Sequence, residues 1–348
     1  MGKLRIELPE PSLEHLQRLT DDTGLFQHAK FTTPLRSEGY TTDDNARALI
    51  VANKYYAQYR DDEALRLLDR YFAFVLHSQN DDGTVKNFMN FDRSWVPNEP
   101  THDALGRTLW AFGELLAQPP APTYIPVAKE HFDISAPLIE KQSLRGMAYS
   151  ILGLAGYLVR FPEADDIRAY MRKAAEKIIL RYEQNHRPDW YWFEDVITYD
   201  NAMPPCALFT AARMLNNKKY LEIAQKTCDF LLTNTFNGRH FSFIGCQGWF
   251  PRGGQKAQFD QQPIEAAGTV LMLNAAYEAT GKEKFLKPRQ KAFDYFLGEN
   301  DLGIPLYDEA SKGCGDGLGA GGISLNQGAE STISFLLGLL IMRQRKQR

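Results

Sequence analysis

The chain has 348 residues, of which 44 % are hydrophobic and 24 % are charged, and its formal net charge is −3. This length and apolar content can fill one large domain, and the small negative charge gives no electrostatic reason to expect a nucleic acid or an anionic membrane surface as a partner. The N-terminus has no apolar core of signal-peptide length, and no 18-residue apolar run occurs anywhere, so we expect a cytoplasmic protein, or a periplasmic one if a leader has been removed.

The first clear helical signal follows a pair of carboxylates. In the stretch EGYTTDDNARALIVANKYY, residues 38–56, apolar residues such as Leu49 and Ile50 recur at helical spacing behind Asp43 and Asp44. For one helix alone, acids at the N-terminus are explained by capping and by the partial positive charge of the helix end. A functional interpretation therefore depends on whether the pattern recurs.

The same arrangement, a polar start followed by an apolar helix, recurs five more times along the chain. The further helices begin at Asp103, Arg145, Asp200 with Asn201, Gln262 and Gln327. Their starts are spaced by roughly 40–65 residues, in or somewhat above the range of helical-pair repeats. Because these helices are apolar nearly all round, we expect them to be buried.

Helices of a second kind lie between the apolar ones. Their apolar stripes alternate with Lys, Arg, Asp and Glu, which is typical of an outer helix with one face in water. We expect these outer helices at residues 13–19, 62–79, 125–141, 166–184, 218–234 and 283–298. In the third of them, Pro126 suits a helix start and Pro137 limits or kinks the helix.

Six buried helices that alternate with six amphipathic ones predict an all-α fold, an (α/α)6 toroid formed by a single domain over residues 1–348, rather than an open superhelix of helix pairs. In a toroid the inner helices run parallel, and their N-termini gather around one mouth. We expect short β-hairpins in the loops of the rim, for example in GRHFSFIGCQGWF, residues 238–250. The polar helix starts then meet in one basin. The largest concave pocket of the protein is expected to be lined by Asp44, Asp103, Arg145, Asp200 and Glu265.

Seven sequence motifs are distinctive, namely LTDDTGLFQHA, GYTTDDNARALI, QNDDGTVKNFMNFDRSW, THDALGRTLWAFGEL, SLRGMAYSILGL, ITYDNAMPPCALF and FDQQPIEAAG. In these stretches the sequence resembles the six-hairpin glycosidase superfamily, and within it the helical proteins that occur alone or fused to glycosyltransferases. The resemblance covers nearly the whole chain. It implies the toroid fold, a sugar or oligosaccharide as substrate, and a functional association with glycosyltransferases.

Carboxylates are the candidate catalytic groups, because glycoside hydrolysis usually needs one carboxyl as acid and another as base or nucleophile. Crowding and limited solvation raise the pKa of some carboxyls, which lets one of them stay protonated as the acid. The candidates are Asp44, Asp103, Glu194 and Asp200, with Asp103 or Glu194 as the acid and Asp44 or Asp200 as its partner. The sequence therefore predicts a glycoside hydrolase.

Loop aromatics suit a sugar ligand, because their faces stack on the C–H faces of pyranose rings while carboxylates and amides bind the hydroxyls. The alternative is that these aromatics only pack the loops onto the toroid. The expected substrate-binding residues are Asp43, His102, Arg145, Trp190, Trp192, Asp195, Asn201, Trp249, Arg252, Gln262, Glu265, Gln327 and Glu330.

Two other functions on the same scaffold stay open. Sugar 2-epimerases use histidines as acid and base, and His28 and His102 lie near motif starts, although the last two inner helices begin with carboxylate and amide groups. A non-catalytic glycan-binding or glycosyltransferase-associated module is the other alternative. No metal or cofactor is expected. The four cysteines are far apart, which predicts free thiols, and GLGAGG at residues 317–322 lacks the βαβ unit of a dinucleotide site.

Overall fold

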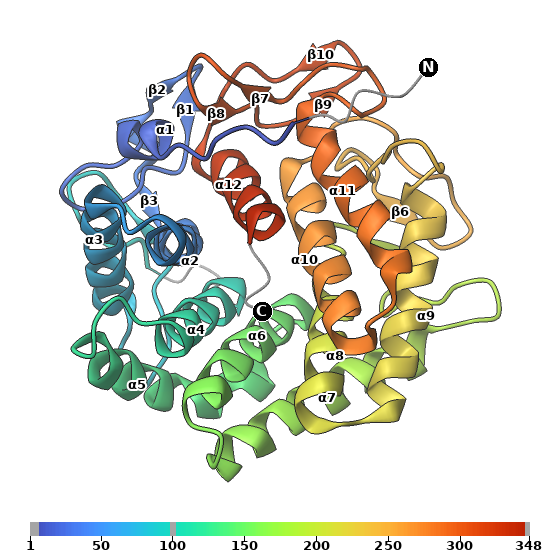
Figure 1. Cartoon of the computed structure of the whole chain (residues 1–348), viewed down its shortest axis with the longest axis horizontal. Helices are drawn as coiled ribbons and strands as arrows, with labels where there is room; N and C mark the ends of the chain where they lie inside the picture. Colours follow the sequence, from blue (N-terminus) through green and yellow to red (C-terminus); the bar gives the residue numbers. More distant parts are fainter. Residues whose placement is uncertain (1–6, 98–101, 345–348) are drawn as a thin grey trace.

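The computed structural model describes residues 7–97 and 102–344, and its helices form a closed double ring (Figure 1). Each inner helix packs against the next, and the last packs against the first, so the ring is closed. The expected all-α (α/α)6 toroid is thus confirmed, and an open superhelix is not formed. The inner helices are α2 (Thr42–Tyr59), α4 (His102–Ala117), α6 (Leu144–Arg160), α8 (Met203–Leu215), α10 (Pro263–Thr280) and α12 (Ala329–Arg343).

Six outer helices surround this ring in the described part of the chain, and each precedes or follows an inner helix in the sequence. The third outer helix ends just before Pro137, as the sequence predicted, and continues as the 3-10 helix η2 (Ala136–Lys141). The outer helices are α1 (Glu14–Arg18), α3 (Asp62–Ser78), α5 (Tyr124–Ser135), α7 (Asp165–Asn185), α9 (Lys218–Thr235) and α11 (Leu286–Asp294).

Glycines bring the inner helices α4 and α6 into backbone contact. A Cβ atom at Gly153 would lie 2.2 Å from the carbonyl oxygen of Leu109, and one at Gly113 would lie 2.1 Å from the carbonyl oxygen of Gly153. Only glycine permits such an approach of two backbones. The small residues of the inner helices therefore set how tightly the ring closes.

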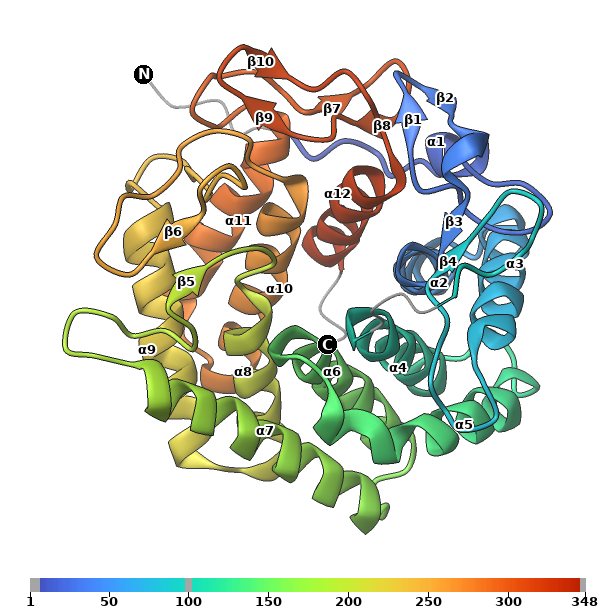
Figure 2. The same ribbon diagram turned by 180° about the vertical axis from the view of Figure 1, so that it is seen from behind.

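The strands in the described residues are short antiparallel pairs, and all lie in the connections that lead into inner helices (Figure 2). The expected hairpin at residues 238–250 is not formed, because Phe250 pairs with Ile197 of a different loop. The long loops thus gather on one side of the ring. The pairs are β1 (Ala29–Lys30) with β2 (Thr33–Pro34), β3 (Tyr40–Thr41) with β4 (Phe88–Met89), β5 (Val196–Ile197) with β6 (Phe250–Pro251), β7 (Tyr307–Asp308) with β8 (Gly313–Cys314), and β9 (Leu318–Gly319) with β10 (Gly322–Ile323).

The apolar side chains of the inner helices and of the inward faces of the outer helices form one continuous core. All four cysteines are free thiols, as expected. Among the described residues, no helix combines the length and the hydropathy needed to cross a membrane.

Candidate active site

The inner helices begin at the side of the ring that carries the strand pairs, which we call the mouth (Figure 2). At α2 the cap is Thr41, whose Oγ1 accepts a hydrogen bond of 3.3 Å from the backbone N–H of Asp44. The Asp44 carboxylate instead accepts bonds from the side chains of Thr41, at 2.7 Å, and Arg47, at 2.5 Å. Capping is therefore done by the threonine, and the carboxylate is left for another role.

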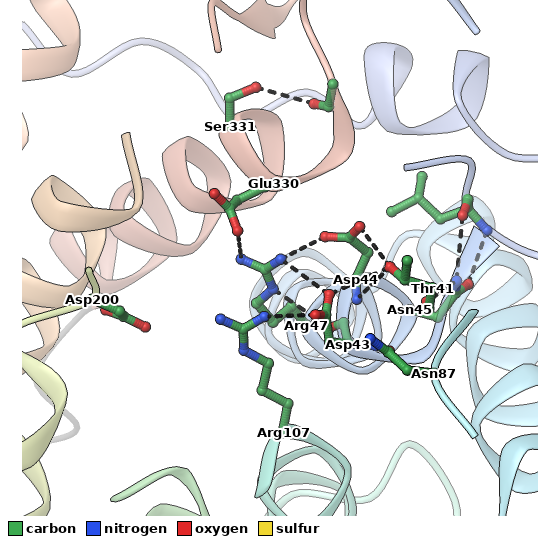
Figure 3. Close-up of polar contacts among 12 residues, drawn as sticks. Thr41, Asp43, Asp44, Asn45, Arg47, Asn87, Arg107, Asp200, Glu330 and Ser331 are labelled. Atoms are coloured by element: carbon green, nitrogen blue, oxygen red, sulfur yellow. Dashed lines mark hydrogen bonds and ion pairs between the residues drawn. The ribbon is translucent and has the colours of Figure 1, made fainter. Parts of the chain in front are cut away.

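Arg47 joins two inner helices by ion pairs (Figure 3). Its Nη2 lies 2.5 Å from Oδ1 of Asp44 and 3.4 Å from Oδ1 of Asp43, both on the same helix. Its Nη1 lies 3.1 Å from Oε2 of Glu330, in the first turn of α12. The Arg47 side chain is only 6 % exposed, so these pairs are shielded from water on the arginine side.

The polar contacts continue around the ring from Asp43. Its Oδ2 lies 3.2 Å from Nη1 of Arg107 on α4, and Nη2 of Arg107 donates a 3.1 Å hydrogen bond to the hydroxyl of Tyr149 on α6. That hydroxyl in turn donates to Oδ2 of Asp200, in the turn before α8. Figure 3 shows Asp200 to the left of Arg47 and Arg107, on a different part of the ribbon. One chain of contacts thus links α12, α2, α4, α6 and the start of α8.

The two adjacent aspartates of α2 have different proton affinities. Burial raises the pKa of Asp44 to about 6, and the charges of Asp43 and Glu330 add to this effect while Arg47 opposes it. For Asp43 burial acts in the same direction, but the charges of Arg107 and Arg47 outweigh it and lower the pKa. Two carboxyls whose environments separate their pKa values are typical of acid–base sites.

A pocket of about 260 Å³ opens between α2 and α12 at the mouth. Carboxylates from both helices and from the loop before α12 line it, together with amides, hydroxyls and one aromatic ring. Such a lining suits a ligand rich in hydroxyl groups. The lining residues are Gln27, His28, Thr41, Asp43, Asp44, Arg47, Phe88, Gln262, Asp316, Gly328, Glu330 and Ser331.

A second polar cluster occupies the neighbouring part of the mouth. Asp103 accepts hydrogen bonds from the hydroxyls of Ser143, at 2.7 Å, and of Tyr199. Arg145 pairs with Glu194 at 3.1 Å and also donates to the backbone carbonyl of Tyr199. None of these side chains lines the pocket between α2 and α12. Among the described residues, no three His, Cys, Asp or Glu side chains are arranged to hold a metal ion.

The expectation that the five residues predicted at the mouth line the largest pocket was wrong, because the larger pockets of about 360, 440 and 570 Å³ contain none of them. Of the five residues, only Asp44 lines the pocket between α2 and α12. Asp200 and Glu265 are buried beneath the mouth, because Asp200 turns toward Tyr149 and Glu265 accepts hydrogen bonds from Asn201. Asn201 itself is fully buried, so a direct contact with substrate does not fit its place in the structure.

The prediction that Trp190 and Trp192 stack on a sugar is also wrong. Trp192 is 0 % exposed and Trp190 is 3 % exposed, and the Trp190 ring packs edge-on against Phe230 of α9. Nε1 of Trp190 donates a 2.7 Å hydrogen bond to the carbonyl of Glu194. These rings thus close a loop onto an outer helix, which was the packing alternative, and they present no face to a ligand.

The other expected binding residues divide between the pocket and the surrounding loops. Gln262 and Glu330 line the pocket, and their contact with substrate stays a prediction. The buried Gln327 side chain bonds to Ser311 and Asp308 instead, with Ser311 donating at 2.7 Å. The part of the chain that the structure describes does not include the side chain of His102. Trp249, Arg252 and Asp195 lie outside the pocket. Trp249 is partly buried against the core, and Arg252 pairs with Asp195 at 2.9 Å.

Two arginines that were not among the predicted site residues, Arg47 and Arg107, organise the site. Arg47 follows Asp43 by four positions in DDNAR, and Arg107 follows Asp103 by four positions in DALGR. Side chains four apart share one face of a helix, so this spacing already indicated carboxylate–arginine pairs at two helix starts. Within α2 the pair forms, whereas Arg107 reaches across to Asp43.

Several solved structures share this fold. A cellobiose 2-epimerase from Bacillus thermoamylovorans B4167 is similar with a TM-score of 0.73 and 11 % identity, over 95 % of this chain and 96 % of that one. A D-mannose isomerase has a TM-score of 0.70 at 10 % identity, with 95 % of each chain covered. A GH76 α-mannanase from Bacteroides thetaiotaomicron has a TM-score of 0.67 at 10 % identity, over 94 % and 92 %.

No protein-family model matches the sequence, and no curated protein matches it at a significant level. The solved structures show that the chain has the (α/α)6 toroid fold, and its chemistry has to be argued from its own residues.

Proposed function

We propose that this protein is a carbohydrate-active enzyme that hydrolyses a glycosidic bond in the pocket between α2 and α12. Asp44 is the general acid and Glu330 is the partner carboxylate. The observation that carries the proposal is the position of Arg47, which lies 2.5 Å from Asp44 and 3.1 Å from Glu330 while all three residues line one pocket.

Asp44 suits the acid role because its pKa, raised by burial to about 6, keeps a substantial protonated fraction in mildly acidic solution. Its proton would pass to the glycosidic oxygen of the leaving group. Thr41 fixes the orientation of the carboxyl through the 2.7 Å hydrogen bond to Oδ2. Asp43, held ionised by Arg107 and Arg47, supports the proton affinity of its neighbour.

Glu330 suits the partner role because it projects from a different inner helix and is accessible to water. Its side chain is 39 % exposed, whereas that of Asp44 is 8 % exposed. Nη1 of Arg47, 3.1 Å from Oε2 of Glu330, orients this carboxylate within the pocket. Asp103, Glu194 and Asp200, the other predicted catalytic residues, stay predictions, with Asp103 and Glu194 engaged in the neighbouring cluster.

The experiment is an assay of the protein and its variants on a panel of oligosaccharides of different sugars and linkages, with release of reducing ends as the readout. Asp44→Asn and Glu330→Gln should each lower turnover by orders of magnitude while the fold is kept. Glu114→Gln is the matched control, because Glu114 lies in the last turn of α4, away from the mouth, where it pairs with Lys54 of α2. Wild-type turnover in both site variants would contradict the assignment.

A sugar epimerase or isomerase is the second candidate, favoured by one feature of the same pocket. His28 lines the pocket together with Asp316, and burial raises the pKa of Asp316 while the charge of His28 opposes the rise. An imidazole next to a carboxyl can move a proton on carbon. Deuterium uptake at C2 of a reducing sugar, abolished by His28→Ala, would establish this candidate. Binding of oligosaccharides without turnover of either kind would establish a glycan-binding module.

The proposal includes a link to glycosyltransferases, supported by the resemblance to helical proteins that are fused to such enzymes. On this basis the substrate is a glycan that a glycosyltransferase produces. The oligosaccharide panel should therefore contain enzymatically synthesised glycosyltransferase products. Preference for these over plant storage oligosaccharides supports the link, and the reverse preference contradicts it.

A further inference from the structure

Two carboxylate oxygens are buried without a hydrogen-bond partner where the start of α8 meets α10. These are Oδ1 of Asp200 and Oε1 of Glu265. The two residues are 3 % and 4 % exposed. A buried oxygen of an ionised carboxylate that has no donor is strongly unfavourable, so at least one of these groups needs a proton or a partner.

The other oxygens of both residues are held in place. Oε2 of Glu265 accepts hydrogen bonds from the backbone N–H and the side-chain Nδ2 of Asn201, at 3.3 and 3.1 Å. Oδ2 of Asp200 accepts the hydroxyl proton of Tyr149. Each carboxyl is thus anchored by one oxygen, and its second oxygen is directed elsewhere.

Gly268 shows where the second oxygen of Asp200 lies. A Cβ atom at Gly268 would be 2.6 Å from Oδ1 of Asp200. Gly268 follows Glu265 by three positions on α10, and residues three apart share one face of a helix. Oδ1 of Asp200 therefore packs against the same face of α10 that carries the Glu265 side chain.

The backbone at Asp200 is strained in a way that requires support. Its φ is +43°, in the left-handed region that an aspartate adopts at some cost. The next residue, Asn201, is the one that Glu265 holds through two hydrogen bonds. Glu265 therefore stabilises the turn that directs the Asp200 carboxylate toward the middle of the ring.

We propose that Glu265 is a positioning residue that carries a proton on Oε1 and shares it with Oδ1 of Asp200. The protonated Glu265 donates, the ionised Asp200 accepts, and both unpartnered oxygens are satisfied by one proton. The shared proton holds Asp200 at the end of the contact chain that runs through Tyr149 and Arg107 to Asp43. This arrangement does not depend on which reaction takes place in the pocket.

The electrostatic surroundings agree with this direction of donation. Burial raises the pKa of Glu265 to about 8, with the charge of Asp200 adding to the rise, and burial raises the pKa of Asp200 to about 6. At neutral pH Glu265 thus keeps its proton and Asp200 is ionised. The cations that act on the pair are Arg47, Arg107 and Arg145, and the weakly acidic groups near it are Tyr149, Cys206 and Tyr295.

The test compares the wild type with Glu265→Gln in the full-length protein. A glutamine keeps an oxygen that accepts from Asn201 and offers an N–H that donates to Asp200 at every pH. Because a raised pKa in the folded state means that protons favour folding, the thermal midpoint of the wild type should fall as pH rises from the ordinary pKa of 4.5 to about 8, and this contribution should level off above about 8. The variant should lose this part of the pH dependence, and Glu114→Gln should retain it.

Infrared spectroscopy provides a second, independent readout. The wild type should show the band of a protonated carboxylic acid at neutral pH, and Glu265→Gln should lack it. Equal pH dependence of the thermal midpoint in the wild type and the variant would overturn the proposal, and so would the absence of the acid band in the wild type. If Glu265→Gln does not fold, the absence of the acid band in the wild type still overturns the proposal, and a band that persists above pH 7 and is lost as pH rises through about 8 supports it.

Discussion

Arg47 on the first inner helix lies 3.1 Å from Glu330 on the last one, so an ion pair of the pocket also crosses the seam where the ring closes. The same guanidinium bonds to Asp44 at 2.5 Å. Formation of the site therefore requires that the two ends of the chain have come together. Ring closure and pocket chemistry share one side chain.

Replacing Arg47 by methionine should destabilise the protein. Methionine keeps much of the side-chain volume but leaves Asp44 buried without its cation, and removing one partner of a buried pair typically costs about 3 kcal/mol or more. The free energy of unfolding, measured by urea denaturation, checks this. Glu330→Gln is the matched variant. It should cost less than about 1 kcal/mol, because Glu330 is partly exposed. Equal costs for the two variants would contradict the prediction.

Gly153→Ala should also destabilise the ring, through packing alone. The new methyl group would lie 2.2 Å from the carbonyl oxygen of Leu109, so α4 and α6 have to separate, at a cost of about 1–3 kcal/mol. The thermal midpoint should fall accordingly. Gly321→Ala, on the rim between β9 and β10, has nothing within 4 Å of its new methyl group and should change stability by less than about 0.5 kcal/mol.

The toroid was predictable because its signal is local. An inner helix such as α6 is apolar nearly all round and an outer helix such as α7 has a charged face, and this alternation is present in the sequence itself. The shared mouth followed from the same pattern, since parallel inner helices begin at one end. The predicted hairpin at 238–250 failed because the pairing of Phe250 with Ile197 joins two loops that are distant in sequence.

The site was predictable only in part, because side-chain direction depends on tertiary contacts. Asp44 and Glu330 were correctly placed at the mouth, but the sequence does not show that Asp103 turns toward Ser143 and Tyr199. His28 and Asp316 reach the pocket from irregular loops, where no periodicity indicates a direction. The burial of Trp192 likewise depends on how its loop closes on α9.

If Asp44 is the general acid, activity should decline on the alkaline side as pH rises through about 6. Its pKa is raised to about 6, so the protonated form needed for donation is lost above that value, and kcat/KM should fall about tenfold per pH unit there. The pH dependence of kcat/KM measures this limb on any substrate that is turned over. A limb several units higher would show that a different group donates the proton.

Asp43→Asn should move that limb to lower pH. The charge of Asp43 helps to raise the pKa of Asp44, so removing the charge lowers it, and Arg47 is then shared only between Asp44 and Glu330. The variant should therefore keep activity at low pH but lose it earlier as pH rises, and the pH profile of kcat/KM measures the displacement. Glu114→Gln removes a carboxylate that pairs with Lys54 far from the mouth, and its profile should match the wild type. If the alkaline limb in Asp43→Asn is unchanged or moves to higher pH, the charge of Asp43 does not raise the pKa of the group that donates the proton. The electrostatic basis for assigning that proton to Asp44 would then be lost.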